Sequence, residues 1–90
     1  MRLDLFLKAS RLILRRTLAQ EFCDAGRVKV NNLPAKSSRE IKPGDEIEIR
    51  RPRRILKARV LEIPKSKQVA RGDAANLYEI ISEEILDFGF

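Results

Sequence analysis

The side chains of this chain whose types favour a particular chemistry are its arginines and lysines. Nineteen of the 90 residues are basic, against thirteen acidic residues and no histidine. A guanidinium is planar and always charged, and its N–H donors form a fork that matches the oxygens of a phosphate group. The chemistry that these residues favour is therefore the binding of a polyanion. The candidate binding residues are Arg2, Arg11, Arg15, Arg16, Arg27, Lys29, Lys36, Arg51, Arg53 and Arg54.

Residue patterns for catalysis or metal binding are missing from the sequence. With no histidine and a single cysteine, Cys23, the chain has no ligand set for zinc or another soft metal. It contains no Ser–His, Cys–His or phosphate-loop pattern, and its carboxylates are scattered. We expect no catalytic residue, no metal and no cofactor, and therefore a protein that is not an enzyme.

Length and charge narrow the class of partner. Ninety residues make one small domain, and an apolar fraction of 43% indicates a folded chain. The net charge is +6, and it is uneven: residues 1–31 and 32–63 carry +4 each, whereas residues 64–90 carry −2. This charge favours a nucleic acid as partner; the alternative is a charged surface that serves only solubility. One cysteine, no long apolar run and no signal peptide favour the reducing cytoplasm, away from membranes.

Residues 15–31 predict a helix, a glycine stop and a strand that follow one another without a linker. The predicted apolar stripe of the helix is Leu18, Phe22 and Ala25, with Ala19 and Cys23 beside it, and the predicted solvent face is Arg16, Thr17, Gln20, Glu21 and Asp24. Gly26 stands where a helix ends in a left-handed residue, and residues 28–30 then alternate as a strand. Arg27 and Lys29 thereby form a predicted phosphate-binding corner.

A first helix is predicted at residues 3–10, with Asp4 at its positive N-terminal end. Residues 12–14, three consecutive apolar residues, connect it to the second helix and are expected to be buried beneath the helix pair. The arginines around this connection are Arg11, Arg15 and Arg16, which Arg2 approaches if the first helix folds back. The alternative is four unrelated surface arginines.

The second half of the sequence predicts a small sheet. Asn31-Asn32 suits a tight hairpin turn, and Pro43-Gly44-Asp45 indicates another turn. The expected elements are a loop at 32–45, strands at 46–50, 56–63 and 78–82, a hairpin end at 50–54, a flexible connection at 64–72, and a single turn at 74–77 capped by Asp73. The arginine run at 50–54 either contacts phosphate or is a solvated tip. Residues 83–90 either pad the sheet or are partly disordered.

Several of these residues stand in a pattern that resembles the S4 (S-four) RNA-binding domain. The pattern is Arg2-Leu3-Asp4, Arg16, the run from Ala25 to Asn31, and Lys42-Pro43-Gly44-Asp45, and it covers residues 1–50. Residues 2–13, 15–19 and 74–78 also resemble the bacterial family that includes RqcP and the fifteen-kilodalton heat-shock protein. The resemblance implies an α+β fold, a small S4-type domain with two short N-terminal helices packed on a small, mainly antiparallel sheet. We expect this domain at residues 1–63 and a C-terminal extension at 64–90.

The family resemblance implies a function that the composition alone does not. It implies an RNA-binding adaptor that binds the large ribosomal subunit, ribosomal RNA and tRNA where peptidyl-tRNA obstructs the subunit. Such an adaptor supports a factor that extends the stalled chain with alanine without a template, and we expect it to be a monomer. The family's motif arginines correspond to Arg2 and Arg16, with Arg11, Arg15, Arg27 and Lys29 beside them. The alternatives are a general ribosome-binding or assembly factor, the RNA-binding domain of an RNA-modification enzyme, and a protein–protein module using the acidic end after residue 72.

Overall fold

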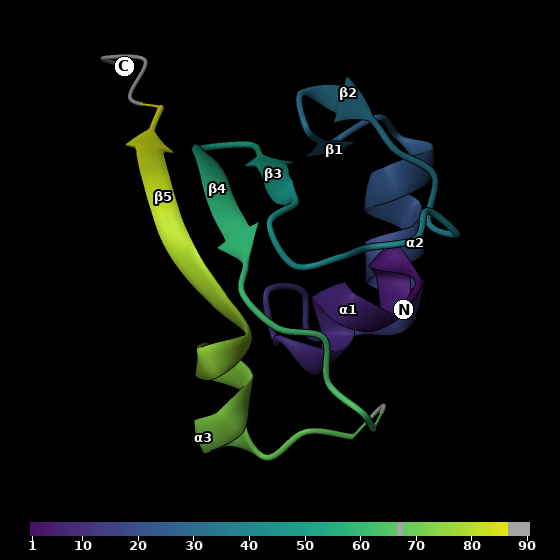
Figure 1. Ribbon diagram of the computed structural model, residues 1–90. Coiled ribbons are helices and arrows are strands. Elements are labelled where there is room, and N and C mark those ends of the chain that lie inside the picture. The colour runs from purple at the N-terminus through teal and green to yellow at the C-terminus, as the bar shows by residue number, and fades with distance from the viewer. Residues whose placement is uncertain (67, 87–90) are drawn as a thin grey trace.

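The computed structural model describes residues 1–66 and 68–86, and these residues form a five-stranded antiparallel sheet, two N-terminal helices, a third short helix and a 3₁₀ turn (Figure 1). In chain order the elements are α1 (Leu3–Ala9), α2 (Arg16–Asp24), β1 (Val28–Val30), β2 (Leu33–Pro34), β3 (Glu46–Arg51), β4 (Arg54–Val60), α3 (Arg71–Ala74), the 3₁₀ turn η1 (Ala75–Leu77) and β5 (Tyr78–Ile85). The strand order in the sheet is β2-β1-β3-β4-β5. Figure 1 shows β5 along the edge of the sheet away from α2. The predicted fold class is confirmed.

Alternation along the strands gives the sheet one apolar face, because successive side chains point to opposite sides. Val28 lies opposite Ile49 and Val30 opposite Ile47, and all four are buried. The same core contains Leu3, Phe6 and Leu7 of α1, Ile13 of the connection, Ala19 and Cys23 of α2, Ile41 and Val60. The helices thus cover the face of the sheet that the sequence pattern marks as apolar.

Gly26 ends α2 in the left-handed conformation that the sequence predicts, with φ of 73°. Its N–H donates to the carbonyl of Cys23 at 3.0 Å, and the N–H of Arg27 donates to the carbonyl of Phe22 at 2.9 Å. These two bonds are those of a Schellman motif, which satisfies carbonyls at the end of the helix. The motif turns the chain directly into β1, and Arg27 is thereby fixed at the end of α2.

Two predicted turns are confirmed by positive φ angles. Asn31 and Asn32 have φ of 51° and 70° and close the hairpin between β1 and β2. Gly44 has φ of 94°, and the N–H of Asp45 donates to the carbonyl of Lys42 at 3.1 Å. The predicted loop at 32–45 is wrong at its start, because Leu33–Pro34 pairs with β1 as the edge strand β2. An edge strand tolerates the proline, whose missing N–H is not needed there.

The buried side of α2 differs from the predicted stripe. Ala19 and Cys23 are buried, whereas Ala25, predicted to be apolar core, is exposed. Arg16 and Gln20, predicted on the solvent face, are half-buried because both reach a carboxylate of α1. The stripe is therefore rotated toward α1, and Leu18 and Phe22 pack only partly against the core.

The connection between α1 and α2 is only partly buried, which corrects the prediction for residues 12–14. Ile13 is fully buried, Leu12 is half-buried, and Leu14 is 70% exposed. Arg11 takes a positive φ of 63° and reverses the chain, after which the N–H of Ile13 donates to the carbonyl of Leu7 at 3.1 Å. A chain that reverses within so few residues directs successive side chains to different sides.

The C-terminal third contains the predicted elements with other bounds. Strand β4 is Arg54–Val60 rather than 56–63, and β5 continues to Ile85 rather than ending at residue 82. The helical turn begins at Arg71, so Asp73 lies inside it and does not cap it. Residues 83–85 extend the sheet because β5 pairs with β4 as far as Arg54. The prediction for the tail falls partly on residues 87–90, outside the described residues, and the domain division at residue 63 stays a prediction.

The predicted hairpin end at 50–54 is mostly strand. Arg50 and Arg51 belong to β3 and Arg54 to β4, so the turn itself contains only Pro52 and Arg53.

No helix in residues 1–66 and 68–86 has the length and apolar character needed to cross a membrane.

Cys23 gives a first test of the packing. Burial, followed by the charges of Asp4 and Asp24, raises the pKa of its thiol to about 11. Because the thiolate is the reactive form, we expect iodoacetamide at pH 8 to alkylate the native protein at least about tenfold more slowly than the protein in denaturant, where the thiol has its ordinary pKa. Mass spectrometry over a time course measures both rates. Equal rates would mean that Cys23 is not buried in the core of the native protein.

Candidate nucleic-acid interface

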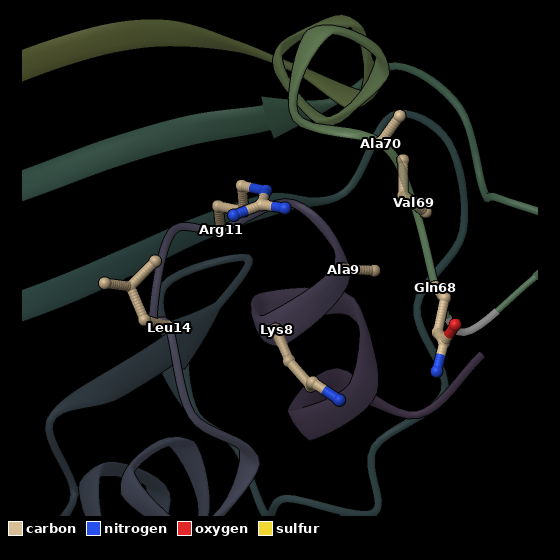
Figure 2. Close-up of a pocket in the computed structure, with 7 residues that line it drawn as sticks. All are labelled: Lys8, Ala9, Arg11, Leu14, Gln68, Val69 and Ala70. Carbon is tan, nitrogen blue, oxygen red and sulfur yellow. The ribbon is translucent and has the colours of Figure 1, made fainter.

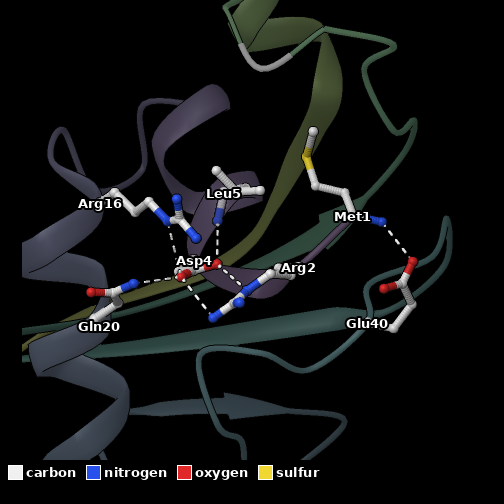
Figure 3. A network of polar contacts seen from close by, with 7 residues as sticks. All are labelled: Met1, Arg2, Asp4, Leu5, Arg16, Gln20 and Glu40. Carbon is white, nitrogen blue, oxygen red and sulfur yellow. Dashed lines mark hydrogen bonds and ion pairs between the residues drawn. The ribbon is translucent and has the colours of Figure 1, made fainter.

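Asp4, in the first turn of α1, is the centre of a polar network (Figure 3). Its side chain is fully buried and accepts hydrogen bonds from two arginines, a glutamine and a backbone N–H. The Nε of Arg2 lies 3.2 Å from Oδ1, and the Nη2 of Arg2 lies 3.3 Å from Oδ2. The Nε of Arg16 and the Nε2 of Gln20 lie 3.2 and 2.9 Å from Oδ2, and the N–H of Leu5 lies 2.8 Å from Oδ1. One carboxylate therefore holds two guanidiniums from different elements.

The carboxyl of Asp4 is ionised at neutral pH despite its burial. Burial alone raises its pKa, but the hydrogen bonds from Gln20 and Arg16, the charge of Arg16 and the N–H of Leu5 together lower the pKa below 3.8. Two guanidiniums against one carboxylate leave a net positive charge in the network. The side chains of Arg2 and Arg16 are 43% and 41% exposed. Within the described residues Arg16 donates to Asp4 only through Nε, so its terminal nitrogens are available to an external anion.

The loop between β2 and β3 holds the start of α1. The N–H of Leu3 donates to the carbonyl of Arg39 at 2.7 Å, and that of Asp4 to the carbonyl of Ser37 at 3.1 Å. The N-terminal ammonium pairs with Glu40 at 2.7 Å (Figure 3). The two backbone bonds of Leu3 and Asp4 satisfy N–H groups that a helix start leaves without partners. They also bring a second exposed basic segment, with Lys36 and Arg39, beside Arg2.

Three features of this region escape the sequence prediction: Gln20, Arg39 and the place of Asp4 at the centre of the network. The sequence pattern assigns Asp4 only to a helix end. A signal is nevertheless present, since Asp4 and Leu7 are three residues apart and share the apolar side of α1. A carboxylate at such a position needs a partner. Arg16 and Gln20, four residues apart on α2, supply two of its partners.

The other predicted residues in the part of the chain that the structure describes do not bond to Asp4, although Arg15 and Lys36 lie close to the Arg2–Arg16 pair. Arg15 is exposed at the N-cap of α2, next to Arg16. Lys29 faces away from the helices and lies 4.0 Å from Glu48, while Arg54 lies 3.6 Å from Glu83. Arg53 is exposed in the turn between β3 and β4. The structure therefore joins Arg2 and Arg16 through their shared partner Asp4, so these two are not unrelated surface arginines, whereas among the described residues neither Arg11 nor Arg15 pairs with that carboxylate.

Arg11 belongs to a different surface. A hollow of about 450 Å³ separates the end of α1 from the segment before α3, and Figure 2 shows Lys8 and Arg11 on the α1 side of it. The residues that line it are Lys8, Ala9, Arg11, Leu14, Gln68, Val69 and Ala70.

Among residues 1–66 and 68–86, no group of three or more His, Cys, Asp or Glu is placed to hold a metal ion.

The fold and the Asp4 network define a small RNA-binding domain of the S4 class, and the S4 domain matches residues 1–47. The RQC P-site tRNA stabilizing factor of Streptococcus pneumoniae is 52% identical over 83 residues, 92% of each chain. That of Bacillus subtilis is 46% identical over 86 residues, 96% of this chain and 98% of its own. Heat Shock Protein 15 of Vibrio cholerae, solved as a trimer, superposes with a TM-score of 0.82 at 27% identity, covering 91% of this chain and 82% of that chain.

The chain belongs to the S4-domain family and, within it, to the family of the RQC P-site tRNA stabilizing factors. The resemblance stated from the sequence is confirmed.

Proposed function

We propose that this protein is an RNA-binding adaptor of ribosome-associated quality control that holds the large ribosomal subunit and a P-site tRNA together. The names of its relatives support P-site tRNA as a binding partner and quality control as the pathway. The observation that carries the proposal is the Asp4 network, which fixes two half-exposed guanidiniums from α1 and α2 in one geometry. A rigid pair of arginines recognises the shape of folded RNA through phosphates and 2′-hydroxyls without reading bases.

The remaining basic residues have a different role in this proposal. Arg15, Lys36 and Arg39 extend the surface of the Asp4 network, because they flank Arg16 and Arg2. Arg53 and Arg54 lie at the far end of the sheet and add general attraction to RNA. The protein acts in the cytoplasm as a binding partner and not as an enzyme. Obstructed subunits and a factor that tails the stalled chain with alanine are its proposed partners.

Sedimentation with large ribosomal subunits, with and without peptidyl-tRNA, tests this function at near-physiological salt. We expect the wild type to prefer occupied subunits. Arg2→Ala and Arg16→Lys are expected to reduce the affinity for occupied subunits about tenfold, because each removes the forked guanidinium donor to phosphate. Arg2→Ala removes the charge and both donors to Asp4, whereas Arg16→Lys keeps the charge and a donor for Asp4, so it tests the guanidinium fork with the buried network kept.

The matched control is Arg53→Ala, which removes one positive charge from an exposed turn. It is expected to weaken binding to occupied and empty subunits alike, and only about twofold. Circular dichroism confirms that each variant is folded. If the wild type shows no preference for occupied subunits, the quality-control role is wrong and the general ribosome-factor alternative replaces it.

A further inference from the structure

A second cluster of arginines lies at the other end of α2. The Cζ atoms of Arg27 and Arg51 lie 5.7 and 5.5 Å from the centroid of the Phe22 ring. Guanidiniums at this distance are attracted by the ring face. The Nη2 of Arg51 also donates to the carbonyl of Leu12 at 3.1 Å. One aromatic ring thus positions two cations that come from the end of α2 and from β3.

These arginines border a hollow of about 460 Å³. It is lined by Arg27, Arg50, Arg51, Pro52 and Leu86. Backbone bonds hold its walls together, since the N–H of Arg50 donates to the carbonyl of Arg27 at 2.8 Å, and that of Leu86 to the carbonyl of Arg53 at 2.9 Å. The lining therefore combines cationic side chains with two apolar ones on a hydrogen-bonded frame.

The charge of this cluster is not balanced within the described residues. There, no carboxylate lies within 4.0 Å of a nitrogen of Arg27, Arg50 or Arg51, whereas Arg2, Arg16, Arg54 and Arg59 all have such a partner. Like charges held close together repel one another, and the repulsion is relieved by a bound anion. The Arg2–Arg16 pair, by contrast, is already organised around the carboxylate of Asp4.

We propose that this hollow is a second RNA site, which takes an unpaired nucleotide. The guanidiniums bind the phosphate of this nucleotide. Its base packs against Pro52 and Leu86 and stacks on the plane of a guanidinium, because bases of single-stranded RNA stack on such planar groups. The inference rests on the proposed RNA-binding function and adds a substrate class, an unpaired strand, to it. Arg16 at the start of α2 and Arg27 after its end place the two sites at opposite ends of one helix.

Fluorescence anisotropy with three labelled probes tests the site: a single-stranded oligouridylate, an RNA duplex of equal phosphate number, and oligoglutamate. The test variant is Arg27→Gln with Arg50→Gln, which leaves Arg51 and its bond to Leu12 intact. The matched control is Lys42→Gln with Arg71→Gln, which removes the same charge from two exposed side chains that do not line the hollow. We expect the test variant to bind the single strand about tenfold more weakly, with a salt slope smaller by about 0.7 for each phosphate that it no longer neutralises. The control and the duplex are expected to change by less than about threefold.

The outcomes separate this site from the proposed function. Equal losses in the test and control variants would overturn the site, because general charge then accounts for binding. Equal losses for duplex and single strand would overturn the assignment to an unpaired nucleotide, and binding of oligoglutamate as tight as that of RNA would assign the hollow to an acidic peptide. If the wild type binds neither RNA probe nor ribosomal subunits, the proposed function itself fails.

Discussion

Asp4→Asn is expected to lower the free energy of unfolding at pH 7 by about 3 kcal/mol, the scale of losing hydrogen bonds between a buried carboxylate and charged donors. Asparagine has nearly the same shape, but its amide nitrogen is a donor placed where Arg2, Arg16 and Gln20 already donate. The loss is limited because both guanidiniums are about two-fifths exposed and regain water. Urea unfolding of both proteins measures the difference.

The same substitution has a defined pH dependence. The pKa of Asp4 is lowered in the folded protein, so its stabilising contribution is fully present above the pKa of the unfolded chain and is lost as pH falls through the lower folded value. The difference in stability between wild type and Asp4→Asn is therefore constant from about pH 5 to pH 8 and shrinks below the ordinary value of 3.8. A difference that stays constant down to about pH 2 would show that the ionised carboxylate is not the source of the stability.

Asp24→Asn is the matched control for Asp4→Asn. Asp24 is an exposed carboxylate in the last turn of α2, so its substitution removes the same charge without breaking the network. It is expected to change stability by less than about 0.5 kcal/mol. Asp4→Asn is also expected to reduce the preference for occupied ribosomal subunits, because Arg2 and Arg16 lose the group that holds them together.

Local patterns in the sequence were sufficient for the parts of the fold that depend on neighbouring residues. The end of α2 at Gly26, the turn at Asn31-Asn32 and the alternation of β3 each follow from residues a few positions apart. The bounds of β5 could not be predicted in this way, because its last three residues form a strand by pairing with β4 and show no strand pattern of their own. The buried face of α2 likewise depends on contacts with α1, and the periodicity of the α2 sequence alone does not reveal these contacts.

The candidate site was predictable only in its residue types. The resemblance names Arg2 and Arg16 but not their common partner, Asp4. Arg16 and Asp4 are twelve residues apart in the sequence and meet only because α1 packs against α2. Arg51 was expected in a hairpin end, yet it lies in β3 and donates to Leu12, 39 residues away. Contacts at such separations depend on the packing of the whole domain, so local patterns in the sequence do not reveal them.

Gly26→Val is expected to destabilise the domain by about 2 kcal/mol, because a β-branched residue is strained at positive φ. The cause is the backbone and not a clash: φ is 73°, and no atom beyond its immediate chain neighbours lies within 4 Å of where a Cβ would stand. Gly26→Asn, which tolerates this conformation, is expected to cost less than about 1 kcal/mol. Gly72→Val adds the same side chain in equally open space without a positive φ, and it is expected to change stability by less than about 0.5 kcal/mol. Urea midpoints rank the three variants. Equal midpoints for the two valine variants would contradict the left-handed cap, and with it the position of Arg27 beside Phe22 on which the second RNA site depends.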